Sequence, residues 1–198
     1  MTANRTVDYF DRQFRRQVGA GEFALNPFEK LALPFLRGRV LDLGCGLGNL
    51  SLEAARRGCS IVAVDGSPNA IERIRQVAIA EALSIQAEET DLAAYRISED
   101  FDAIAAIGLL MFFPSPRALE MLGEIQARVR SGGCAIVNVL VEGTTFLEMF
   151  EPGHYYLFGR DELQDRFAGW EILESRGDTF EAPGATLKVF STLVARKP

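Results

Sequence analysis

A glycine-rich stretch in the first quarter of the chain carries the residue types that most clearly indicate a ligand site. An acid and three glycines alternate with other residues in the order Asp42-x-Gly44-x-Gly46-x-Gly48. Glycines let the backbone approach a ligand closely and adopt dihedral angles that side chains forbid. A plain turn rarely needs three alternating glycines, and an unpaired carboxylate is costly to bury in an apolar strand. The pattern therefore predicts a binding loop in which Asp42 meets a cationic amine.

The main alternative for this loop is a dinucleotide site. The dinucleotide fingerprint is G-x-G-x-x-G, and its third glycine would fall at position 49. The chain has Asn49 at that position. A nicotinamide-dependent oxidoreductase therefore remains an alternative, although the spacing disfavours it.

A second acid, Asp65, follows the β-branched run at residues 61–64. An acid at the end of the strand after a glycine loop has the right spacing to bind a ribose. A carboxylate only accepts hydrogen bonds, and two vicinal hydroxyls can both donate to it. We expect Asp65 and the adjacent Gly66 to contact a ribose; the alternative is a solvated acid in a turn.

The loop resembles the first motif of class I methyltransferases that depend on S-adenosylmethionine (SAM). In that family the loop wraps the methionine part of SAM, and the acid helps to hold its amino group. The resemblance implies that Gly44, Cys45 and Gly46 contact SAM. Cys45 lies where a small side chain suffices, so we do not expect a catalytic thiol there.

The same resemblance assigns the far end of the cofactor to residues after the third and fourth predicted strands. It implies that Asp91 accepts from the adenine amino group and that the backbone N–H of Leu92 meets the ring. It also implies that the chain near Ile107 passes the cofactor. The alternative for Asp91 is membership of an exposed acidic cluster with Glu88 and Glu89.

These residues must be positioned by a sheet, and the hydrophobic pattern predicts one. Short apolar runs alternate with stretches of helical period, which is typical of a mostly parallel sheet covered on both faces. Two terminal strands without a full helix between them predict an antiparallel C-terminal hairpin. We therefore expect a three-layer, Rossmann-like, doubly wound α/β fold with seven strands. The predicted strands are 40–43, 61–64, one near 85, 101–107, 134–141, 170–173 and 187–195. The predicted helices are 49–57, 68–83, 117–129 and 160–167.

The resemblance narrows to the tellurite-resistance (TehB-type) methyltransferases and covers nearly the whole chain in order. It is carried by Tyr9-Phe10-x-x-x-Phe14 and by the segments 108–113, 160–163, 169–171 and 193–197. It implies that an N-terminal helical segment, residues 1–36, closes over the cofactor. The alternative is a helix stripe that packs on the core, because positions 10 and 14 share a helix face.

The chain departs from that family in the segment that enters its last strand. TehB-type members carry histidine and arginine there, whereas residues 179–186 of this chain contain neither. An oxyanion site should supply cationic donors, so the departure disfavours tellurite or selenite as the acceptor.

No catalytic residue stands out, and the candidates lie in the segment after the fifth predicted strand. His154 is the sole histidine and a candidate general base. Tyr155 or Tyr156 is a candidate for orienting the acceptor. The alternative is a surface histidine beside two packing tyrosines. A soft nucleophile needs no strong base, whereas an oxygen nucleophile usually does.

Composition limits the classes of partner. The chain has 198 residues, which suits a single domain over 1–198, and its net charge of −6 disfavours a nucleic acid. The apolar run at 104–113 is too short to span a bilayer, and the N-terminus lacks the apolar core of a signal peptide. Three cysteines form no metal-ligand spacing and fit a reducing cytoplasm.

The sequence thus predicts a cytoplasmic enzyme that transfers a methyl group from SAM to a small molecule, leaving S-adenosylhomocysteine (SAH). The acceptor is expected to be small and is a candidate soft sulfur, selenium or tellurium nucleophile. We expect a monomer or homodimer without metal, membrane or nucleic-acid partners. Besides the oxidoreductase, a SAM-binding regulatory module without catalysis is the remaining alternative.

Overall fold

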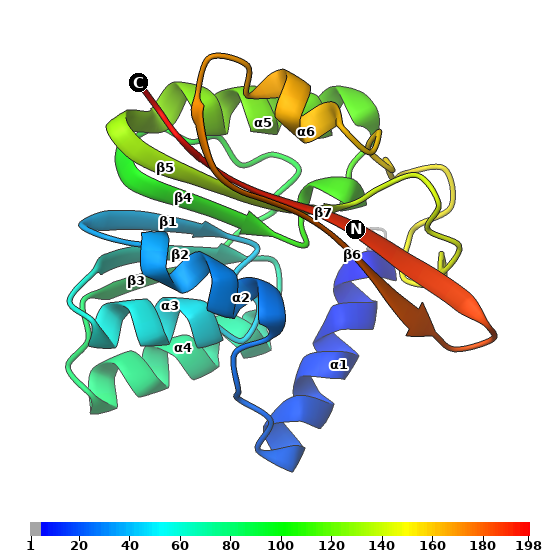
Figure 1. The fold of residues 1–198 in the computed structure, drawn as a ribbon. Helices are drawn as coiled ribbons and strands as arrows, with labels where there is room; N and C mark the ends of the chain where they lie inside the picture. The colour runs from blue at the N-terminus through cyan, green and yellow to red at the C-terminus, as the bar shows by residue number, and fades with distance from the viewer. Residues whose placement is uncertain (1–4) are drawn as a thin grey trace.

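A seven-stranded sheet forms the centre of the protein, whose computed structural model describes residues 5–198 (Figure 1). Residues 1–4 of the predicted N-terminal segment lie outside the described residues. The strand order is β3-β2-β1-β4-β5-β7-β6, and β7 runs antiparallel to both of its neighbours. The strands are β1 (Arg39–Leu43), β2 (Ser60–Asp65), β3 (Ile85–Glu89), β4 (Phe101–Ile107), β5 (Val129–Leu140), β6 (Glu171–Ala182) and β7 (Thr186–Arg196). The predicted mostly parallel sheet with an antiparallel C-terminal hairpin is confirmed.

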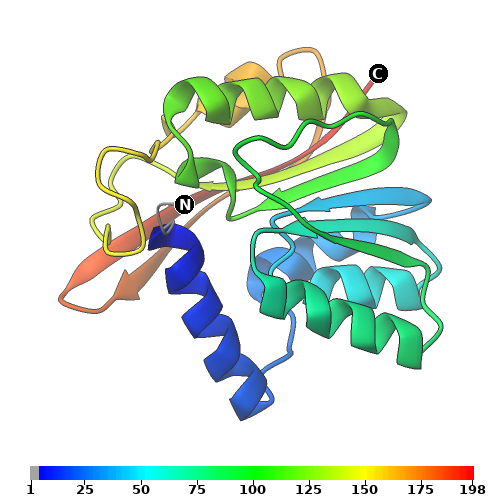
Figure 2. The ribbon, with the colours of Figure 1, turned by 180° about the vertical axis from the view of Figure 1, so that it is seen from behind.

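Helices cover both faces of the sheet and so explain its continuous apolar runs, because strands buried on two sides need no polar alternation. One face carries α2 (Pro27–Ala32), α3 (Asn49–Arg56) and α4 (Pro68–Ala80), and the other carries α5 (Ser115–Arg128) and α6 (Glu162–Arg166). Figure 2 shows α4 and α5 from behind, on opposite sides of the sheet. Short 3-10 turns lie at η1 (Leu33–Phe35) and η2 (Leu110–Phe112).

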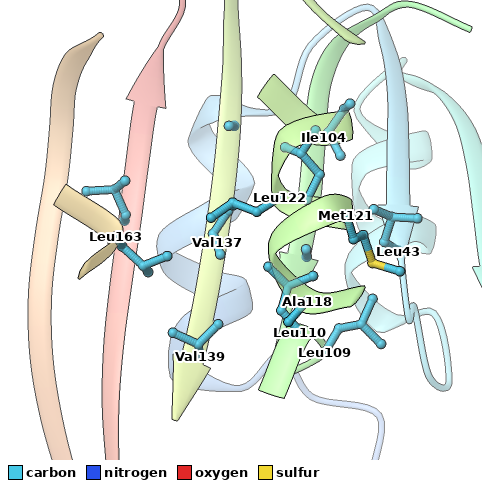
Figure 3. Packing of buried hydrophobic residues seen from close by; sticks show 14 of the residues in the cluster. Leu43, Ile104, Leu109, Leu110, Ala118, Met121, Leu122, Val137, Val139 and Leu163 are labelled. Atoms are coloured by element: carbon cyan, nitrogen blue, oxygen red, sulfur yellow. The ribbon is translucent and has the colours of Figure 1, made fainter. Parts of the chain in front are cut away.

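The core on the α5 face fixes β4 and β5 beneath that helix. Ala118, Met121 and Leu122 of α5 are buried in one cluster with Ile104 and Val137 of the sheet (Figure 3). These close-packed side chains leave little freedom for the strand ends. The carboxyl ends of β4 and β5 are therefore firmly placed for a site.

The remaining helix, α1 (Arg5–Ala20), stands on the side of the sheet where β4 ends (Figure 1). Ligands in open α/β sheets bind at that side, beyond the carboxyl ends of the strands. No helix within residues 5–198 is long and apolar enough to cross a membrane.

Several predicted boundaries differ from the observed ones. The strand predicted at 134–141 begins at Val129, and its pairing with β4 has an irregularity between Phe101 and Ala103. The strand predicted at 170–173 continues to Ala182. Most β6 side chains are exposed, so the strand is held by its ladder to β7 and carries no apolar pattern.

Candidate active site

The acid of the glycine loop, Asp42, is buried at the end of β1. Its side chain is 4 % exposed, and Oδ2 accepts a hydrogen bond of 2.6 Å from the Ser51 hydroxyl of α3. Burial raises the pKa of Asp42 to about 7, although the Ser51 hydrogen bond opposes the rise. The carboxylates of Glu29 and Asp65 raise this pKa further. A cationic ligand beside Asp42 would stabilise its charged form and so offset both the cost of burial and the repulsion from Glu29 and Asp65.

The loop after Asp42 depends on glycine at each of the three predicted positions. Gly44, Gly46 and Gly48 have φ angles of 68°, 52° and 71°, in the left-handed region that favours glycine. A Cβ atom at position 48 would lie 2.4 Å from a side-chain carbon of Ile74. The glycines thus allow the tight passage from β1 into α3.

Asp65, at the end of β2, ties the loop to the start of α4. Its Oδ2 accepts from the backbone N–H of Gly46 at 2.9 Å, and its Oδ1 accepts from that of Ser67 at 2.8 Å. Burial raises the pKa of Asp65, while these backbone hydrogen bonds lower it. A carboxylate has about four acceptor positions, so Asp65 keeps acceptor capacity for ligand hydroxyls.

A pocket of about 990 Å³ lies at the carboxyl ends of β1 to β4 and is lined by every residue predicted to bind the cofactor. These residues are Asp42, Gly44, Cys45, Gly46, Asp65, Gly66, Asp91, Leu92 and Ile107. Segments far apart in the chain meet here because parallel strands end at one edge of the sheet. Their contact with a cofactor stays a prediction. No group of three or more potential metal ligands occurs within residues 5–198.

Two of the three aromatic residues of α1 contribute to one wall of this pocket. Phe10 and Phe14 both line it, and the Phe10 ring packs edge-on against Phe112 of η2 at 5.1 Å. Asp11 fastens the helix to the start of α4, because its carboxylate accepts from the Ser67 hydroxyl at 2.7 Å and from the Asn69 amide at 2.8 Å. Phe10 and Phe14 therefore line the pocket and also pack on neighbouring elements, while closure of this helix over a cofactor stays a prediction.

The three catalytic candidates do not lie among the described residues that line the pocket. His154 is exposed, and its Nδ1 lies 3.2 Å from the Pro152 carbonyl oxygen. Tyr155 stacks on Phe150, with 4.6 Å between ring centroids. The Tyr156 hydroxyl donates to Glu162, and burial together with that carboxylate raises its pKa. The pocket geometry gives no support to His154 as a general base or to either tyrosine as the group that orients the acceptor.

Several other polar residues that the sequence did not single out line the pocket, and three of them bear on its chemistry. Glu29 of α2 accepts from the backbone N–H of Asn26 at 2.7 Å in a capping box, and burial raises its pKa. Asn138 is buried in the apolar run of β5. Lys188 of β7 is half-buried, with Nζ 4.5 Å from the centre of the Phe146 ring, and burial lowers its pKa.

Sequence signals for two of these residues were present. Glu29 completes the pattern Asn26-x-x-Glu29, which is typical of a helix start. Asn138 interrupts a run of apolar residues, as Asp42 does in β1. Neither signal by itself indicates a pocket, because partners from distant segments complete it.

Comparison with known proteins agrees with this geometry. Residues 40–133 match the family model described as a methyltransferase domain. Hemagglutinin 1 of Eikenella corrodens is 31% identical over 169 residues, which cover 81% of this chain and 55% of that protein. A probable S-adenosyl-L-methionine-dependent methyltransferase TehB of Haemophilus influenzae (strain 10810) is 27% identical over 197 residues, which cover 96% of this chain and 66% of that protein.

A solved structure has the same fold. The crystal structure of TehB from Haemophilus influenzae superposes with a TM-score of 0.77 at 24% identity, covering 98% of this chain and 67% of that one. The predicted class is therefore confirmed: this chain carries a class I SAM-dependent methyltransferase domain. Among such proteins it resembles TehB. The chain spans 55% to 66% of the length of these two curated relatives.

The residues present fit SAM, the cofactor of this class. Asp42 is a buried carboxylate with a single hydroxyl partner among residues 5–198, and Glu29 and Asp65 raise its pKa. SAM carries an ammonium, a sulfonium and a carboxylate, so its net charge is positive and this cluster of acids complements it. The acceptor capacity left on Asp65 suits the hydroxyls of its ribose.

Proposed function

We propose that this chain transfers the methyl group of SAM to a small-molecule acceptor, with SAH as the second product. The observation that carries the proposal is that the pocket continues past the glycine loop to an apolar wall. That wall is formed by Met111, Phe112, Leu140, Met149 and Phe190. Pockets for small molecules have volumes of roughly 300–1,000 Å³. This pocket, of about 990 Å³, lies at the upper end of that range, which supports space for an acceptor beside SAM.

The proposed roles follow the positions of the acids. Asp42, with Glu29 beside it, holds the ammonium of SAM, and Asp65 accepts from the ribose hydroxyls. Asp91 accepts from the adenine amino group next to the Leu92 backbone. Ile107, at the end of β4, borders the passage between cofactor and acceptor. Each of these residues lines the pocket.

SAM supplies an electrophilic methyl group whose transfer breaks the carbon–sulfur bond and leaves a neutral thioether. The contribution of the protein is to hold the acceptor in line with that bond. Proximity and orientation account for about 7–11 kcal/mol in favourable models. In our proposal α1 acts as a lid that excludes water, with Phe10 and Phe14 over the pocket.

A soft sulfur, selenium or tellurium acceptor is a second candidate, and Lys188 is the observation that favours it. This half-buried cation lines the pocket and has no carboxylate within ion-pair distance among residues 5–198. It could supply the positive charge that residues 179–186 lack. The buried free thiols of Cys45, Cys59 and Cys134 support the proposed cytoplasmic location.

Calorimetric titration with SAM and SAH tests the proposal. We expect both to bind the wild type, and Asp65→Ala to weaken binding by about 1–3 kcal/mol through the lost ribose hydrogen bonds. SAH release with a panel of small acceptors then tests transfer. If neither SAM nor SAH bound at millimolar concentration, the proposal would be wrong.

A further inference from the structure

Beside the apolar wall of the pocket lies the buried side-chain oxygen of Asn138, which has no hydrogen-bond partner among the described residues. This atom indicates the chemistry of the acceptor. We propose that Asn138 positions the methyl acceptor by accepting a hydrogen bond from its N–H or O–H group. The acceptor is then a small, largely apolar molecule with a protic nitrogen or oxygen. This inference rests on the proposed function and assigns a substrate class to the same site.

The first observation is the environment of the Asn138 side chain. It is 0 % exposed, in a strand whose neighbouring residues are apolar and buried. Its Nδ2 donates to the Thr192 hydroxyl of β7 at 2.8 Å. Its Oδ1 is buried and has no hydrogen-bond partner among the described residues. An unsatisfied buried carbonyl is unfavourable, so the atom calls for a donor that the folded chain does not supply.

The second observation is where this atom lies. Asn138 pairs in register with Ile107 of β4 on one side and Thr192 of β7 on the other. It lines the pocket, and β4 separates it from the glycine loop that follows β1. The register Asp42–Ala105–Ile136 places Asn138 two residues further along β5, on the sheet face that Asp42 shares. Asn138 thus lies beyond the proposed cofactor half.

The third observation is that the cofactor half already matches the donors of SAM. In the proposed function the ammonium of SAM pairs with Asp42 and Glu29, and its ribose hydroxyls donate to Asp65. The lining around Asn138 is apolar, with Leu140 on the same strand and Phe190 on β7. A donor for Oδ1 therefore comes from the second molecule in the pocket. An apolar body with one N–H or O–H matches this wall.

Thermal unfolding of the ligand-free protein separates this role from a structural one. Replacing both partners of a buried hydrogen bond by apolar groups of similar shape is nearly neutral or stabilising. We expect the double variant Asn138→Leu/Thr192→Val to melt at or above the wild-type temperature. The matched control is Thr144→Val, because the buried Thr144 hydroxyl is fully used by the backbone of Val189. That control should melt lower by about 2–4 °C and still transfer methyl groups.

Calorimetry and turnover then identify the partner of Oδ1. Asn138→Leu should bind SAM and SAH within threefold of wild type. With aniline, phenol and thiophenol as matched probes, kcat/KM should fall at least tenfold for aniline and phenol. Thiophenol, a weak donor, should be affected less. Asn138→Asp keeps an acceptor oxygen and should retain more activity than Asn138→Leu.

Three results would overturn the inference while the proposed function stands. The first is a tenfold loss of SAM affinity in Asn138→Leu, and the second is a double variant that melts well below wild type. The third is that the wild type methylates only thiophenol, or none of the three probes. The first would make SAM the partner of Oδ1, and the second would make Asn138 a structural residue. Absence of SAM and SAH binding by the wild type would instead remove the proposed function itself.

Discussion

The two halves of the pocket recognise their ligands by different means. The cofactor half, at the ends of β1 and β2, is built from carboxylates such as Asp42 and Asp65. They accept hydrogen bonds from helix α3, from the glycine loop and from the start of α4. The acceptor half, at β5 and β7, is lined mainly by apolar side chains, with Asn138 and Lys188 as its polar groups. In the proposed function, charge selects a cationic cofactor in one half, while shape and a few polar contacts select the acceptor in the other.

The sharpest test of this contrast is removal of the buried charge, so we expect the largest effect from Asp42→Asn. The amide keeps the shape and can still accept from Ser51, but it no longer neutralises the ammonium of SAM. Loss of one partner of a buried charge pair costs about 2–5 kcal/mol, which calorimetry of SAM binding would measure.

The matched control is Asp102→Asn, at the opposite end of β4, where the carboxylate accepts from the backbone N–H of Arg39 at 2.7 Å. SAM affinity of that variant should stay within twofold of wild type. Equal losses in both variants would mean that Asp42 contributes through fold stability and not through charge.

The pH dependence of SAM binding is the next largest effect. The pKa of Asp42 is raised to about 7 in the ligand-free protein, chiefly by burial. Below pH 7 a proton must leave before the carboxylate can pair with the ammonium, so SAM affinity should fall by up to about tenfold per pH unit. Burial raises the pKa values of Glu29 and Asp65 as well, and their protonation acts in the same direction.

The stability of the ligand-free protein should respond to pH with the opposite sign. Because the pKa of Asp42 is higher in the folded state than its ordinary value, the folded state keeps a proton between about pH 4 and 7 that the unfolded state has lost. The contribution of Asp42 to stability is present below about pH 4 and is lost as the pH rises through 7. The difference in melting temperature between wild type and Asp42→Asn should therefore change from pH 5 to pH 8, with the wild type losing stability relative to the variant; a difference that stayed constant with pH would contradict this assignment.

The lid helix α1 bridges the two halves, and loosening it should have a smaller effect. Asp11→Ala removes the hydrogen bonds from Ser67 and Asn69 that fasten α1 to the start of α4. Since a hydrogen bond contributes a net ~1 kcal/mol, SAM affinity should fall roughly fivefold, measured by calorimetry. Arg12→Ala, an exposed change on the same helix, is the matched control and should bind SAM like the wild type.

How far the sequence predicted each half follows from the same contrast. The cofactor loop is local: Asp42 and three glycines lie within seven residues, and Asp65 follows after one helix. Their types and spacing therefore indicated a ligand before any fold was known. Together with the alternating apolar runs, they also predicted the sheet.

The acceptor half could not be predicted in this way because distant segments build it. Asn138 reaches the pocket from β5, but its unpartnered oxygen is evident only once Thr192 of β7 is paired beside it. Lys188 lies on a strand whose neighbour, β6, has no apolar pattern along most of its length. His154 was chosen for its residue type and for its place after the fifth predicted strand, but it lies exposed at the surface.

The smallest expected effect therefore belongs to His154, and it tests whether the acceptor half works without this base. His154→Ala should leave both SAM affinity and the rate of SAH release within twofold of wild type, because the exposed ring does not line the pocket. The rate should be compared from pH 6 to 8, where a histidine base would impose its own titration. A tenfold loss of rate with unchanged SAM affinity would mean that His154 contacts the acceptor during catalysis. It would also mean that the segment after β5 moves onto the pocket and that the acceptor half includes a general base.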